Sequence, residues 1–66
     1  MIIQSILFDR SIFTLALAKK WLVAHGFKTD VDTKPKHFRF RQMPPNKKYK
    51  YATKTIAAGI QIIIAS

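Results

Sequence analysis

The sequence predicts a two-layer α+β fold in which one helix packs on a small antiparallel sheet, with the element order β-α-β-β-β. Three observations predict it. One apolar arc has helical spacing, two later stretches alternate apolar and charged residues, and both ends of the chain are rich in branched apolar residues. The chain of 66 residues is expected to form a single domain, residues 1–66, and its apolar fraction of 48% is typical of a folded protein.

The first half of the chain is expected to hold a strand and then the helix. Ile2 to Phe8 favours a strand that is buried on at least one face. After a short polar turn, the stretch from about Ile12 to His25 contains neither Gly nor Pro and predicts an amphipathic helix. Ser11 and Thr14 are both candidate N-caps, and Gly26 is placed to form a left-handed C-terminal cap. The apolar arc of the helix consists of Leu15, Leu17, Ala18, Trp21 and Leu22.

The middle of the chain predicts a β-hairpin. Lys28 to Lys34 is polar and is interpreted as a connection with a short extended piece around Val31. Lys36 to Gln42 and Lys47 to about Ile56 both alternate in the manner of strands, and the sequence Pro-Pro-Asn between them is typical of a turn. We therefore expect these two strands to pair with each other in antiparallel fashion.

The last strand, from Ile60 onward, has apolar residues on both faces and no charge. Such a strand aggregates readily when it lies at a sheet edge. We expect it either to lie centrally, beside the N-terminal strand, or to form a subunit interface. The small core and the absence of cysteine also favour association, so the sequence predicts a homo-oligomer, most simply a dimer.

The distribution of charge carries the functional prediction. The net charge is +9, and the segment from Lys34 to Lys54 contains eight of the twelve basic residues and no acidic one. Because side chains alternate between the faces of a strand, the cations here are expected on one face of the sheet and the aromatic residues on the other, under the helix. The cations expected on the uncovered face are Arg39, Arg41, Lys48 and Lys50, and the aromatic residues are Phe38, Phe40, Tyr49 and Tyr51.

A cationic sheet face with no base-reading groups favours binding of nucleic acid, most simply DNA, without sequence specificity. In a two-fold dimer each charge would contribute twice. Tyrosines that face outward would instead form a platform for unpaired bases, and core packing is the preferred interpretation for both. The predicted phosphate contacts are Arg39, Arg41, Lys47, Lys48, Lys50 and Lys54, with Lys34 and Lys36 at the margin.

Two other classes of function compete with this one. The alternative is a protein interaction or structural module whose hairpin docks on an acidic partner. Enzymatic chemistry is poorly supported, because the chain has three acidic residues, two histidines and no cysteine. Asp30, Asp32 and His37 could in principle hold a divalent ion, but the neighbouring lysines favour surface ion pairs. We therefore expect no catalytic residue, cofactor or metal, and neither a targeting nor a membrane-spanning segment.

Several short motifs resemble a family. The chain is similar, from about Ser5 to Ile64, to a small domain with an aromatic-Arg-aromatic-Arg-Gln signature that occurs in head-region proteins of tailed phages and in small proteins of large DNA viruses. The family has a tyrosine pair where this chain has His37-Phe38. The resemblance implies a viral origin and packaging in the virion. We accordingly expect the protein in the virion or in the host cell interior, and in the alternative function its acidic partner is a viral or host protein. The residues that carry the resemblance are Thr14, Ala18, Trp21-Leu22, His25-Gly26-Phe27, Phe38-Arg39-Phe40-Arg41-Gln42 and Gly59-Ile60.

Overall fold

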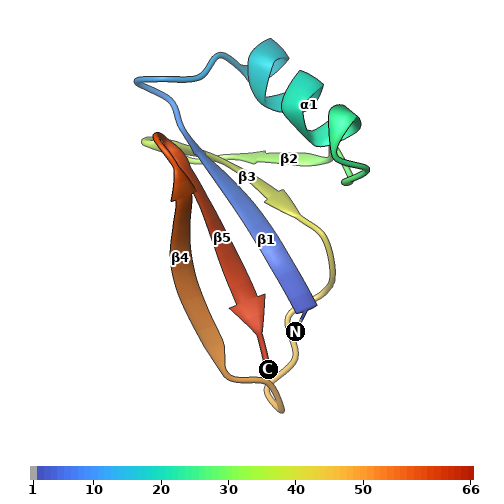
Figure 1. Ribbon diagram of the computed structural model, residues 1–66. Helices are drawn as coiled ribbons and strands as arrows, with labels where there is room; N and C mark the ends of the chain where they lie inside the picture. The colour runs from blue at the N-terminus through green and yellow to red at the C-terminus, as the bar shows by residue number, and fades with distance from the viewer. Residues whose placement is uncertain (1) are drawn as a thin grey trace.

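The computed structural model describes residues 2–66, and these form one helix and five strands. The strands make one antiparallel sheet in the order β2-β3-β1-β5-β4 (Figure 1). The predicted α+β class is confirmed, and the sheet has one strand more than expected because β2 pairs with β3 instead of remaining a connection. The elements are β1 (Ile2–Asp9), α1 (Leu15–Ala24), β2 (Val31–Thr33), β3 (His37–Arg41), β4 (Tyr51–Ala57) and β5 (Ile60–Ala65).

The first and last strands of the chain lie at the centre of the sheet. β1 pairs with β3 along one edge and with β5 along the other, and β5 then pairs with β4. The central position predicted for the charge-free strand is therefore confirmed. Because both edges of β5 are paired within the chain, this strand no longer supplies a reason to expect a subunit interface.

The predicted hairpin between Lys36–Gln42 and Lys47–Ile56 is wrong. β3 pairs with β1 and β2, whereas β4 pairs only with β5, so β1 and β5 separate the two strands. Pairing with β1 places Phe38 beside Phe8, and both residues are buried in the core. That arrangement buries both aromatic side chains, whereas β4 forms an exposed edge of the sheet.

The aromatic core is centred on Phe8. Its ring makes edge contacts with Phe13, Trp21 and Phe40, at centroid distances of 5.0, 5.6 and 5.5 Å. Such geometry is the preferred one for aromatic pairs. The predicted alternation of β3 is confirmed, because Phe38 and Phe40 are buried against the helix side of the sheet. The buried core residues are Ile6, Phe8, Ala18, Leu22, Phe38, Phe40 and Ile60.

The helix begins at Leu15, so the second of the two candidate N-caps is the one that the structure uses. Thr14 is its N-cap, and the Thr14 hydroxyl accepts a hydrogen bond from the Leu17 N–H at 3.2 Å. Ser11, the other candidate, donates from its hydroxyl and N–H to the Asp9 carboxylate instead. The N–H groups of the next two residues donate to the Asp9 carbonyl, so this segment forms a turn before the helix.

The predicted C-terminal cap of the helix is confirmed. Gly26 has φ +77°, in the left-handed region that glycine adopts without strain. The N–H of Phe27 donates to the Leu22 carbonyl at 2.9 Å, and the N–H of Gly26 donates to the Val23 carbonyl at 3.2 Å. These two bonds define a Schellman motif, which satisfies carbonyls that the end of the helix leaves without partners.

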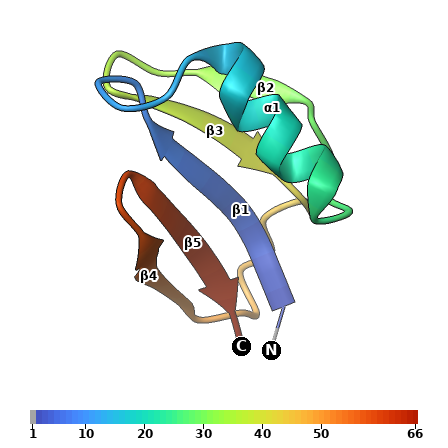
Figure 2. The same ribbon diagram turned by 45° about the horizontal axis from the view of Figure 1, so that its top comes forward.

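The helix covers only part of the sheet. Figures 1 and 2 show α1 beside β2 and β3 and over one end of β1, whereas β4 and the C-terminal half of β5 extend away from it. We call the side of the sheet opposite α1 the open face. Within residues 2–66, no helix has both the length and the apolar character needed to cross a membrane. Strand register assigns to the open face Ile2, Ser5, Leu7, Asp9, Asp32, His37, Arg39, Arg41, Tyr51, Thr53, Thr55, Gln61, Ile63 and Ala65.

Candidate functional site

The basic residues predicted to contact nucleic acid do not share one sheet face. Register places Arg39 and Arg41 on the open face, as predicted, because they pair with Leu7 and Ser5. Lys54 pairs with Ile62, which packs against the core, so Lys54 lies on the same side of the sheet as the helix. The prediction of a single cationic face is therefore wrong for Lys54.

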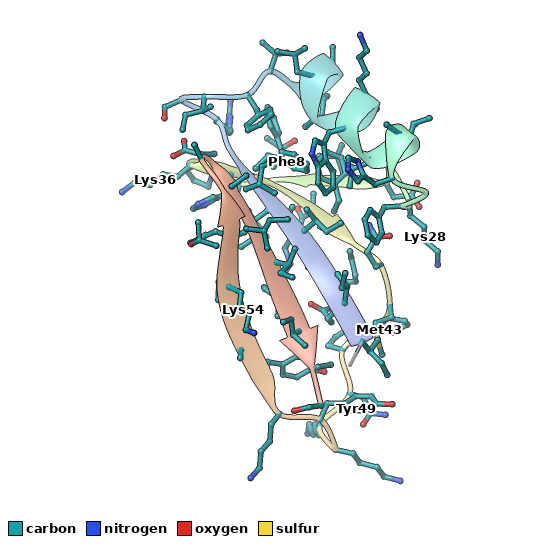
Figure 3. All side chains as sticks on the ribbon, in the orientation of Figure 1. Phe8, Lys28, Lys36, Met43, Tyr49 and Lys54 are labelled. Atoms are coloured by element: carbon teal, nitrogen blue, oxygen red, sulfur yellow. The ribbon has the colours of Figure 1, made fainter. Side chains whose placement is uncertain are left out.

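The remaining lysines lie outside the strands. Lys34 and Lys36 belong to the turn between β2 and β3, and Lys34 pairs with Asp32 at 3.1 Å, as predicted for the surface acids. The other three, Lys47, Lys48 and Lys50, lie in residues 42–50, which we call the basic loop. Figure 3 shows Lys36 and the loop residue Tyr49 at opposite ends of a molecule whose longest dimension is 33 Å. The cations thus form separate groups.

The basic loop is held against the end of the sheet by hydrogen bonds. The Gln4 side chain donates to the Met43 carbonyl at 3.1 Å, and the N–H of Gln42 donates to the Gln4 carbonyl at 2.7 Å. At the other end of the loop, Lys50 and Ser66 exchange two backbone hydrogen bonds of 2.8 and 2.9 Å. Because both ends are fixed, the loop presents its lysines in a defined position.

Tyr51 fixes the middle of the loop. Its hydroxyl accepts a hydrogen bond from the Asn46 N–H at 2.7 Å and donates one to the Asn46 carbonyl at 2.9 Å. The Asn46 side chain in turn accepts from the N–H of Lys48 at 2.9 Å. The prediction that Tyr51 packs in the core under the helix is wrong, since the residue is 42% exposed and pairs with Ala65 on the open face.

A β-bulge explains the orientation of Tyr51. Ala57 pairs with Ile60, but Thr55 pairs with Gln61, so Ile56 is an extra residue in β4. Without this extra residue, Tyr51 would lie on the same side of the sheet as Ile60, which is the side covered by the helix. A shift of one residue transfers every side chain on one side of the bulge to the other face of the sheet. The bulge therefore moves Tyr51 onto the open face and Lys54 off it.

Arg39 lies in the middle of the open face and is half-buried. Its guanidinium is within 3.4 Å of the Ser5 hydroxyl and 3.3 Å of the Gln4 side-chain oxygen. Gln4 and Ser5 are themselves buried, at the irregularity in the pairing of β1 with β5. Register also places Asp32 opposite Arg39 on the same face, but within residues 2–66 the Asp32 carboxylate forms its ion pair with Lys34.

Two adjacent hollows lie where the basic loop meets the open face. The first has a volume of about 280 Å³, and its lining includes the polar side chains of Arg39 and Thr53. The second also has a volume of about 280 Å³ and includes Lys47. Pro45 and Tyr51 line both, so these two residues lie between the hollows.

A third hollow, of about 180 Å³, is lined by polar residues at the other end of the open face. It contains Asp9 and His37, which are cross-strand neighbours. The pKa of Asp9 lies below its ordinary value of 3.8. The hydrogen bond from the Ser11 hydroxyl lowers it most, followed by the hydrogen bond from the Ser11 N–H and by the nearby His37. The same bonds close the turn after β1, so a structural role accounts for this carboxylate. Within the described part of the chain, no group of three or more potential metal ligands gathers.

The sequence interpretation missed Gln4 and Pro45 as site residues, and it named Tyr51 only in the alternative in which the tyrosines face outward. Two adjacent polar residues inside an apolar strand, Gln4 and Ser5, were a usable signal, because they interrupt the alternation and indicate a bulge. Comparisons with protein-family models, with curated proteins and with solved structures found no match for this chain.

Proposed function

We propose that this protein binds nucleic acid without sequence specificity and that the basic loop is its main contact. The observation that carries the proposal is an ordered loop with Lys47, Lys48 and Lys50, which lies in a stretch of sequence without acidic residues. In space, Asp30 borders the start of this loop, beside Arg41 and Gln42. Asp32 is the last acidic residue of the chain, so β3, the loop, β4 and β5 contain none. Arg41 directly precedes the loop and extends the positive charge onto the open face.

The charge of the protein supports a polyanionic partner. The net charge is +9, and Asp32–Lys34 is the one ion pair within residues 2–66. Phosphate contacts release condensed counterions, which drives binding without base-specific groups. In this proposal Arg39 and Arg41 contribute from the open face. Lys34, Lys36 and Lys54 are secondary contacts, because they lie at the far end of the molecule or on the other side of the sheet.

The resemblance described above adds a setting to the proposal, namely viral DNA inside a virion or a host cell.

The dimer expected from the sequence is retained as a prediction, and the mass of the protein in solution, measured by light scattering, tests it. The competing proposal is that the same loop docks on an acidic protein surface.

Fluorescence titrations with labelled random-sequence DNA, as duplex and as single strand, test the proposed function. The salt concentration is varied, and polyglutamate serves as a polyanion without phosphates or bases. We expect both DNAs to bind at low salt, with an affinity that falls on a log-log plot by about 0.9 per phosphate contact on duplex. No binding at low salt, or polyglutamate binding as tightly as DNA, would refute the proposed function.

A further inference from the structure

We infer that the preferred ligand of the basic loop is single-stranded nucleic acid, with unpaired bases stacked at Tyr51. This inference rests on the proposed function and names its substrate class. It starts from the position of Tyr51, an aromatic residue on an exposed strand directly after three loop lysines. Single-strand binding proteins combine such a positively charged track for the backbone with aromatic rings for the bases.

The bulge at Ile56 supports a binding role for Tyr51. It turns this aromatic ring out of the helix-covered side and onto the open face, where the ring is 42% exposed. The ring contributes nothing to the core cluster, which is made by other residues. β-bulges commonly re-aim a side chain at a functional surface.

The two hollows beside Tyr51 suit single bases in size and chemistry. Pockets for drug-sized ligands have volumes of roughly 300–1,000 Å³, so hollows of about 280 Å³ each suit a smaller planar group. Pro45 and Tyr51 give both hollows apolar surface for stacking. In the first hollow, Arg39 and Thr53 supply polar groups that can bond to base edges.

The tether of the Tyr51 hydroxyl to Asn46 prepares the site for binding. Two hydrogen bonds, of 2.7 and 2.9 Å, hold the side chain in one orientation before any ligand arrives. Less side-chain freedom is therefore lost on binding. Lys47 lines the second hollow and is placed to contact a phosphate beside a base stacked there.

Charge alone does not select single strands, because duplex DNA carries the higher charge density. The bases of a duplex are already stacked on one another, so only an unpaired base can occupy a hollow beside Tyr51. The site therefore predicts a preference for single strands that depends on the bases as well as on the phosphates.

The first test uses the unaltered protein. Affinities are measured for a random single strand, for an abasic oligonucleotide of equal length, and for the duplex. We expect the abasic strand to bind about tenfold more weakly than the strand with bases. Equal affinity for the two strands would overturn the inference but leave the proposed function intact, since the phosphates alone would then account for binding.

The second test uses three variants with a matched control. Tyr51→Leu removes the ring, Tyr51→Phe keeps the ring but removes the tether, and Tyr49→Leu removes the loop tyrosine that lines neither hollow. Circular dichroism verifies folding. We expect Tyr51→Leu to bind the single strand about tenfold more weakly while its duplex affinity changes less than about twofold. Tyr51→Phe and Tyr49→Leu are expected to keep the single-strand preference.

Two results would overturn the inference in this second test. The first is a Tyr51→Leu variant that keeps its single-strand preference, and the second is a parallel loss of affinity for single strand and duplex. Either would mean that the ring does not contact bases. In the first case binding through the lysines would persist unchanged, and in the second the loss would come from the loop that the Tyr51 hydroxyl holds. Failure of the unaltered protein to bind any DNA would instead remove the proposed function, and this inference with it.

Discussion

Gln42 holds the backbone of Lys28 with both ends of its side-chain amide. The amide oxygen accepts from the Lys28 N–H at 2.8 Å, and the amide nitrogen donates to the Lys28 carbonyl at 3.0 Å and to the Phe40 carbonyl at 3.2 Å. The end of β3 is thereby tied to the segment that follows the helix. This role accounts for a glutamine at the end of the FRFRQ motif without any contact to a ligand.

The first prediction is that Gln42→Ala lowers the free energy of unfolding by about 1–2 kcal/mol, since bonds that are partly exposed contribute about 0.5–1.5 kcal/mol each. Chemical denaturation monitored by Trp21 fluorescence measures the loss. Lys28→Ala is the matched control, because both bonds reach the Lys28 backbone and survive this substitution. An equal loss in the two variants would contradict this role for Gln42.

The second prediction compares two glycines with similar backbone angles. Gly26 has φ +77° and no atom within 4 Å of the position that a Cβ would occupy, whereas Gly59 has φ +78° and a Cβ there would lie 2.9 Å from Ile12 Cδ1. Gly26→Ala is therefore expected to cost roughly 1–2 kcal/mol, from the left-handed backbone alone. Gly59→Ala is expected to cost roughly 1–3 kcal/mol more, because of the steric overlap.

Thermal unfolding of the two glycine variants measures this difference. Adding Ile12→Ala to Gly59→Ala removes the closest atom and should recover part of the extra loss, as a double-mutant cycle would show. A larger loss of stability in Gly26→Ala than in Gly59→Ala would contradict the predicted steric overlap between a side chain at position 59 and Ile12.

The third prediction concerns pH. The folded-state pKa of Asp9 lies below 3.8, chiefly because the Ser11 hydroxyl and N–H donate to the carboxylate. A carboxyl group whose pKa is lower in the folded state stabilises the fold at pH values above its unfolded-state pKa. This contribution is lost as the pH falls through the folded-state pKa. Ser11→Ala should therefore reduce stability at neutral pH and have less effect at a pH below both pKa values.

Nuclear magnetic resonance titration of the Asp9 carboxyl checks the cause directly. The pKa of Asp9 should rise toward 3.8 in Ser11→Ala, because the first and largest of the lowering interactions is removed. An unchanged Asp9 pKa in this variant would show that Ser11 is not what holds it low.

The local features of the fold were predictable from the sequence. The cap at Gly26 follows from the position of a glycine after an apolar arc, and the alternation of Phe38 and Phe40 with Arg39 follows from strand geometry. The hazard of an uncharged edge predicted that the last strand is covered, either by a central position in the sheet or by a subunit interface, and the structure shows the first. Each of these depends on a few neighbouring residues.

The pairing of the strands was not predictable in the same way. The Pro-Pro-Asn sequence indicated a tight turn, but burial of Phe38 beside Phe8 decides the partner of β3, and those two residues are far apart in the sequence. The face of Tyr51 depends on a single extra residue, Ile56, because one bulge reverses the parity of the strand. The candidate site was therefore predicted in its charge but not in its geometry.

The measurement that tests the central proposal most directly compares two variants that each lose three positive charges. One is Lys47→Gln/Lys48→Gln/Lys50→Gln in the basic loop, and the other is Lys19→Gln/Lys20→Gln/Lys28→Gln, on exposed residues of the helix and the segment after it. The affinity of each for single-stranded DNA is measured at several salt concentrations.

We expect the loop variant to lose affinity at least tenfold and its log-log salt dependence to fall by about 2, since three contacts contribute about 0.7 each on a single strand. The helix variant should keep a salt dependence close to that of the unaltered protein. Equal losses in the two variants would contradict the assignment of binding to the basic loop and would indicate that only net charge matters.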